Sequence, residues 1–66
     1  MKIEILIKPI RINKKITLNQ LSRLTGISAT HINHVENNLK EPGLSIMIRI
    51  AYALKVDITD LYKIHW

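Results

Sequence analysis

Four residues between positions 29 and 34 have the side-chain types and the helical spacing to bind a ligand from one face of a helix. They are small or uncharged and largely polar: Ala29, Thr30, Asn33 and His34. An Asn amide can bridge adenine, Thr and Ala methyl groups can pack on the methyl of thymine, and His can bond to guanine or phosphate. These residue types favour contact with base edges in a major groove, with some preference for A/T pairs. An ordinary solvated helix face is the alternative.

Residues 17–36 predict the two short helices and tight turn that would position this face. Thr17 stands three residues before Gln20, the spacing of a reciprocal helix cap, so we expect a helix over about 18–25. Gly26 can take a positive φ and end that helix.

A second helix is predicted over about 29–37. Ile27 is apolar within the turn and can wedge between the two crossing helices. Ser28 caps the second helix, and Ile32 and Val35 lie one turn apart on its inward face. Asn38 suits the left-handed residue that closes it.

The remaining chain predicts three further helices and a short strand. Residues 2–8 alternate with Ile on one face, as in a strand. Pro9 suits a first helical turn, so we expect a helix over about 9–14, a fourth over 44–54, and a fifth over 58–63 capped by Asp57. Residues 62–66 alternate again and could pair with the first strand.

Composition indicates one small domain spanning residues 1–66. The 66 residues include three aromatics and no Phe, so the core must be aliphatic. The chain has no Cys and no apolar run of about 20 residues, so we expect neither a disulfide nor a membrane span, and a cytoplasmic location. The net charge of +5 suits a polyanionic partner.

No catalytic or metal-binding set is evident. His31 and His34 are three residues apart, but no carboxylate or thiol at suitable spacing completes a metal site. No nucleophile and base pair or glycine-rich phosphate loop accompanies them. We therefore expect a protein that is not an enzyme and binds no metal or cofactor.

The stretch from Thr17 to Glu36 resembles the helix-turn-helix of the Cro/phage-repressor-like family, also called the xenobiotic-response-element type. The likeness extends over about residues 8–62. Further residues fall where that family's pattern expects them: Arg11, Asn37, Asn38, Pro42, Leu44, Met47, Ile48, Ile50, Ala51, Ala53, Leu54, Val56, Asp60, Leu61 and Tyr62.

The resemblance implies an all-α, five-helix, lambda-repressor-like DNA-binding domain, to which the alternating pattern of the terminal segments could add a small two-stranded pairing. It implies an internal ion pair between Arg11 and Glu36, whose Arg could also be aimed at a phosphate; two independent surface charges are the alternative. It also implies phosphate contacts from the start of the second helix and from the loop after the third. Those positions are Thr17, Leu18, Asn19, Asn37, Asn38 and Lys40.

Several positions depart from the family pattern. Leu18 replaces a frequent Gln, which puts that phosphate contact in doubt, and Leu39 replaces a polar loop residue. Asn38 and Lys55 stand where Gly is common, and Gly43 removes a capping hydroxyl. Ile46 and Tyr52 add apolar surface to the fourth helix, of the kind that marks a partner surface.

These observations together predict a sequence-specific transcriptional regulator, most simply a repressor that binds double-stranded DNA as a homodimer. The alternative is an antitoxin or adaptor with the same fold. In that role Leu39, Ile46, Tyr52 and Trp66 would bind another protein.

Overall fold

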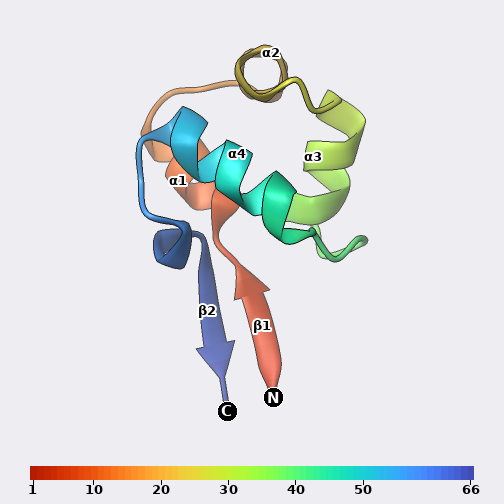
Figure 1. Ribbon diagram of the computed structural model, residues 1–66, viewed down its shortest axis with the longest axis vertical. Coiled ribbons are helices and arrows are strands. Elements are labelled where there is room, and N and C mark those ends of the chain that lie inside the picture. Colours follow the sequence, from red (N-terminus) through yellow and green to blue (C-terminus); the bar gives the residue numbers. More distant parts are fainter.

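Four α-helices enclose an aliphatic core, and a two-stranded sheet projects from one end of the helical body (Figure 1). The computed structural model describes residues 1–66. Its elements in chain order are β1 (Lys2–Ile5), α1 (Ile7–Asn13), α2 (Leu18–Thr25), α3 (Ala29–Glu36), α4 (Leu44–Leu54), the 3₁₀ turn η1 (Ile58–Leu61) and β2 (Tyr62–His65).

The predicted pairing of the two terminal segments is confirmed. Strands β1 and β2 are antiparallel, with Ile3 opposite Ile64 and Ile5 opposite Tyr62. The strand prediction over residues 2–8 was too long, since the strand ends at Ile5 and α1 begins at Ile7. Ile7 is fully buried in the core, so helix packing overrides the alternating pattern there. Pro9 therefore lies in the first turn of α1, where its missing N–H would have no helical partner.

The prediction of a fifth α-helix was wrong, since the fold has four α-helices and the predicted two-stranded pairing of its ends. Residues 58–61 form one 3₁₀ turn, and the chain then enters β2. Asp57 does begin this turn, and its backbone N–H donates to Asp60 Oδ2 at 3.1 Å. The Leu6 N–H donates to the Leu61 carbonyl at 2.8 Å, so pairing with the first strand takes backbone groups that a longer helix would need.

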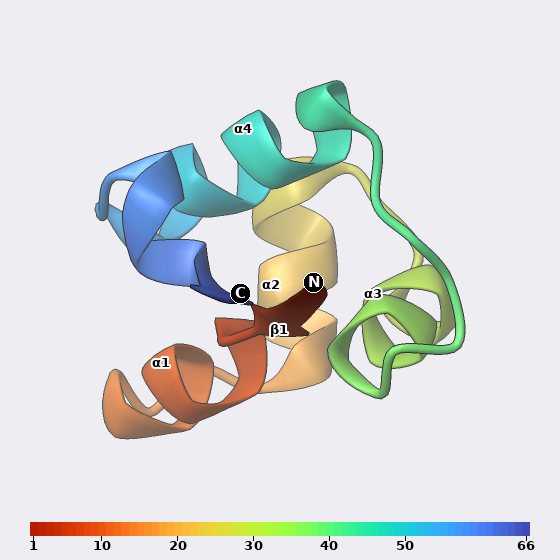
Figure 2. The same ribbon diagram turned by 90° about the horizontal axis from the view of Figure 1, so that it is seen from below.

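The core consists of aliphatic side chains from every helix, from the turn between α2 and α3 and from η1. Seven of its side chains are essentially inaccessible to solvent: Ile7, Leu21, Ile32, Val35, Ile50, Leu54 and Leu61. Figure 2, seen from the sheet end, shows α1, α2, α3 and α4 arranged around this interior. Helix α3 lies at one side of the body, so its outer face is open.

Three non-glycine residues adopt left-handed backbone conformations. Asn38 (φ 59°) does so after α3, as the sequence predicted, and Lys55 (φ 57°) does so at the end of α4, where the family commonly has Gly. Lys15 (φ 59°) does so between α1 and α2, where no such conformation was predicted. Gly43 precedes α4 without any side-chain cap.

Candidate nucleic-acid interface

The α2–turn–α3 unit is held by the caps that the sequence predicted. The Gln20 N–H donates to Thr17 Oγ1 at 3.0 Å, and the Thr17 N–H donates to Gln20 Oε1 at 2.8 Å. Gly26 ends α2 with φ 75°. The His31 N–H donates to Ser28 Oγ at 3.1 Å and so begins α3. The Thr17–Gln20 cap therefore fixes the start of α2, while Gly26 and the Ser28 cap define the turn between α2 and α3.

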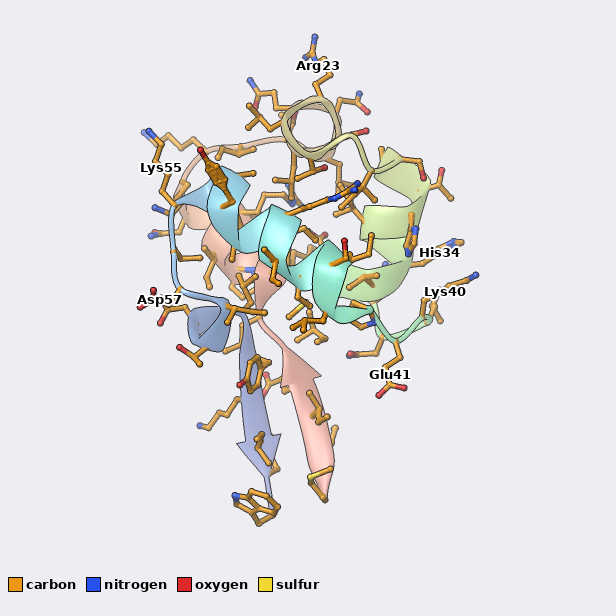
Figure 3. The ribbon with its side chains drawn as sticks, viewed as in Figure 1. Arg23, His34, Lys40, Glu41, Lys55 and Asp57 are labelled. Atoms are coloured by element: carbon orange, nitrogen blue, oxygen red, sulfur yellow. The ribbon has the colours of Figure 1, made fainter.

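Helix α3 is divided into an inward apolar side and an outward polar side. Ile32 and Val35 are completely buried. Thr30 and Asn33 are exposed, whereas Ala29 and His34 are partly exposed. Figure 3 shows His34 pointing away from the helical body on the same side as Lys40. The four predicted base-contacting residues therefore remain open to a ligand along one helix.

A hydrogen bond within this outward face was missed by the sequence reasoning. The Asn37 Nδ2 group donates to Asn33 Oδ1 at 3.0 Å. The two residues are four apart on a helix, a spacing at which side-chain amides meet, so the signal was present. An amide oxygen has two lone pairs, so Asn33 can bridge adenine through its Oδ1 and Nδ2 atoms while Oδ1 still accepts from Asn37.

The start of α2 offers backbone donors rather than side chains. Thr17 and Gln20 satisfy each other, which leaves the N–H groups of Leu18 and Asn19 without a helical partner. The Leu18 side chain packs against the core, whereas Asn19 is exposed. Leu18 can therefore contact an anion only through its backbone N–H, at the positive end of the helix dipole.

The segment after α3 carries the second group of predicted phosphate contacts. Asn37, Asn38 and Lys40 are all exposed. The Leu39 N–H donates to the His34 carbonyl at 2.8 Å, which ties this segment to the last turn of α3. Lys40 and His34 consequently lie on one side of the molecule (Figure 3).

Arg11 and Glu36 form a bidentate ion pair beneath this surface. Arg11 Nε donates to Glu36 Oε2 at 2.8 Å, and Nη2 donates to Oε1 at 3.1 Å. Arg11 Nη1 donates to the Ile16 carbonyl at 2.9 Å. The side chains of Arg11 and Glu36 are 9% and 1% exposed, so the ion pair is buried and all three hydrogen bonds of the guanidinium go to internal acceptors. The pair joins α1, the α1–α2 connection and the end of α3.

The surplus apolar residues separate into two groups. Ile46 is partly buried and packs against the core, so it offers less free surface than the others. Leu39, Tyr52 and Trp66 are 70%, 77% and 90% exposed. On α4, Leu44 and Ile48 share the exposed stripe with Tyr52, since the three residues are four positions apart.

The family comparison agrees with this geometry. The family model described as Helix-turn-helix matches residues 7–61, which includes α1 through η1. A search of curated proteins found no match. No helix here has the length and apolar character needed to cross a bilayer. The chain belongs to the Cro/C1-type helix-turn-helix family, a family of DNA-binding regulatory domains that are generally not enzymes.

Proposed function

We propose that this protein is a sequence-specific transcriptional repressor that reads the major groove through the outward face of α3. The observation that carries the proposal is the chemistry of this face. It presents Thr30, Asn33 and His34, while the only carboxylate of α3, Glu36, is buried against Arg11. A surface with hydrogen-bonding groups and no exposed carboxylate suits the edges of bases between two phosphate backbones.

The distribution of charge supports the same orientation. Three of the five acidic residues, Glu4, Asp57 and Asp60, lie on β1 or around η1. In Figure 3, Asp57 lies on the opposite side of the body from His34 and Lys40. A polyanion approaching α3 therefore avoids most of the negative charge of the protein.

The proposed mechanism is steric. Helix α3 enters the groove, and α2 lies across the backbone with the N–H groups of Leu18 and Asn19 directed at a phosphate. The segment with Asn37, Asn38 and Lys40 contacts the backbone on the other side of α3. A protein bound in this way over a promoter blocks polymerase without any ligand-binding step.

A binding selection from random duplexes, at a stated salt concentration, followed by substitution tests this assignment. Asn33→Ala or His34→Ala should cost about 1–3 kcal/mol on the selected site and little on random DNA, because both residues are assigned to bases. Lys40→Ala should weaken both kinds of DNA alike and reduce the salt dependence. Lys55→Ala is the matched control, since Lys55 lies on the far side of the body (Figure 3). Equal losses on both DNAs for all three interface variants would refute the division of roles.

We further propose that two copies bind adjacent half-sites. One module of this size contacts few base pairs, and helix-turn-helix proteins commonly bind as dimers to half-sites about 34 Å apart. Footprinting at saturating protein should reveal a roughly palindromic site. A single short asymmetric footprint would contradict the two-copy arrangement.

An antitoxin or adaptor role is the second candidate function. The observation that favours it is the exposed stripe of Leu44, Ile48 and Tyr52 along α4, which faces solvent as a protein-binding surface would. The same binding selection separates the two functions. Failure to enrich any duplex, together with a toxin gene beside the coding sequence, would favour the protein-binding role.

A further inference from the structure

The small sheet has an open edge along β1. It contains only two strands, so each strand has one side with no neighbour. The Leu6 N–H donates to the Leu61 carbonyl at 2.8 Å, and these residues continue the register that places Glu4 opposite Lys63 and Lys2 opposite His65. In an antiparallel pair, hydrogen-bonded positions alternate along the strand. The N–H and C=O groups of Ile3 and Ile5 therefore point away from β2, towards the open edge.

The order of side chains on β1 is self-complementary. We propose that a second copy of this chain pairs with β1 along this edge, in the antiparallel register that places Ile3 opposite the partner's Ile3. The two sheets then form one four-stranded sheet. In this register Lys2 lies opposite the partner's Glu4, and Glu4 opposite the partner's Lys2, so two opposite-charge pairs form across the two-fold axis. Opposite charges at such positions stabilise paired strands, and like charges destabilise them.

Neighbouring registers of β1 are unfavourable. A shift of one residue places an Ile side chain opposite a charged one, because opposed residues share a face of the sheet. A shift of two residues places Lys2 opposite the partner's Lys2, or Glu4 opposite the partner's Glu4. The register centred on Ile3 alone matches apolar with apolar and positive with negative. It also uses the outward-pointing N–H and C=O groups of Ile3.

The open edge of β2 lacks this complementarity. A pairing centred on Ile64 would place Lys63 opposite the partner's His65, with no carboxylate on either residue. Glu4 Oε1 already lies 2.8 Å from His65 Nε2 of the same copy. The other carboxylate oxygen, Oε2, is left for the partner's Lys2. Charge therefore selects the β1 edge over the β2 edge.

Space beside β1 is open for the second strand. A groove of about 740 Å³ lies between β1 and the segment leading into α4, and its lining includes Ile3, Ile5, Pro42 and Met47. In the proposed register the partner's Met1 lies opposite Ile5, at the groove. The sheet projects from the helical body (Figure 1), so the outer part of β1 is also free of the helices.

Pairing also extends the apolar side of the sheet. Ile3 and Ile64 occupy one face and are 43% and 37% exposed. In the proposed dimer, the Ile3–Ile64 pair of each copy lies beside that of the other copy at the two-fold axis. Two paired strands of four residues bury less surface area than a standard protein interface, so association should be weak and should require a high protein concentration. This inference concerns the free protein and stands apart from the DNA-binding proposal.

The test reverses one charge at a time on the full chain and measures mass by analytical ultracentrifugation from about 10 µM to about 1 mM, where weak association is detected. The parent protein should shift from one copy towards two across this range. Lys2→Glu and Glu4→Lys should each associate at least about 10-fold more weakly, because two like-charge contacts replace two favourable ones. Circular dichroism verifies that each variant retains the parent helix content.

A mixture of the two variants is the decisive sample. Lys2→Glu carries two acidic positions on β1 and Glu4→Lys carries two basic ones, so the variants should pair with each other more strongly than either pairs with itself. Lys55→Glu, a reversal of the same sign remote from the sheet, should associate like the parent. A parent that stays monomeric throughout, or variants that associate as strongly as the parent, would overturn the proposal. A folded mixture of the two variants without restored association would also overturn it. So would a dimer that Ile48→Asp abolishes and the two β1 substitutions leave unchanged, because the contact would then lie on α4.

Discussion

Replacement of Arg11 by Ala should destabilise the whole domain, although Arg11 belongs to no hydrophobic cluster. Its guanidinium makes three hydrogen bonds, two to the Glu36 carboxylate and one to the Ile16 carbonyl. The Glu36 side chain is only 1% exposed. Without Arg11, this carboxylate would be left in the interior with no counter-charge, and the Ile16 carbonyl would lose its side-chain donor.

The size of the effect follows from this burial. Removal of one member of a buried ion pair costs about 3–5 kcal/mol, because the remaining charge stays desolvated. At about 0.05–0.15 kcal/mol per residue, a chain of 66 residues has a stability of only about 3–10 kcal/mol. Arg11→Ala should therefore remove a large part of the free energy of unfolding. At about 4–8 °C per kcal/mol, the midpoint of thermal unfolding should fall by more than about 12 °C.

Thermal and urea unfolding followed by circular dichroism measure this effect. The double variant Arg11→Met with Glu36→Leu is the matched control, because it replaces both charges by apolar groups of similar size. It should be more stable than Arg11→Met alone, since no unpaired charge remains buried. The reasoning would be refuted if Arg11→Ala melted within about 2 °C of the parent, well below the shift expected for a buried pair. A loss of DNA affinity without a loss of stability would instead make Arg11 a phosphate contact.

Three further substitutions test the turns and caps by the same unfolding measurements. Gly26→Ala should lower the free energy of unfolding by about 1–2 kcal/mol through backbone strain alone, since φ is +75° and no atom lies within 4 Å of the added Cβ. Gly26→Asn should lower it less, because Asn tolerates the left-handed region better than Ala, and equal losses would argue against strain. Lys55→Gly should raise the free energy of unfolding by about 0.5–1 kcal/mol, because φ is 57° in a position that favours glycine. A less stable variant would mean that the Lys55 side chain makes a stabilising contact. Thr17→Ala should cost about 1 kcal/mol by removing the hydroxyl that accepts from the Gln20 N–H, whereas Thr17→Ser should melt like the parent.

Local signals in the sequence were sufficient for the helix-turn-helix. The Thr17 and Gln20 cap, the positive φ of Gly26 and the Ser28 cap all depend on residues within one or two turns of each other. The inward positions of Ile32 and Val35 follow from helical period alone. For the same reason, the residues that α3 presents to solvent could be identified from the order of amino acids alone.

Tertiary contacts decided the features that depend on distant segments. Residues 58–63 carry a helical pattern, but pairing of β2 with β1 supplies backbone partners that stop the helix after one 3₁₀ turn. Ile46 appears as surplus apolar surface on its own helix, yet packing against the core buries part of its side chain.

The sequence by itself determined which residues α3 exposes and where α2 and α3 are capped, because those properties arise from neighbours along the chain. The family resemblance anticipated the pairing of Arg11 with Glu36, but the tertiary structure alone decided how deeply this pair is buried and that β1 keeps an open edge. Both depend on which distant backbone and side-chain groups remain unpaired after packing, and no local pattern encodes that.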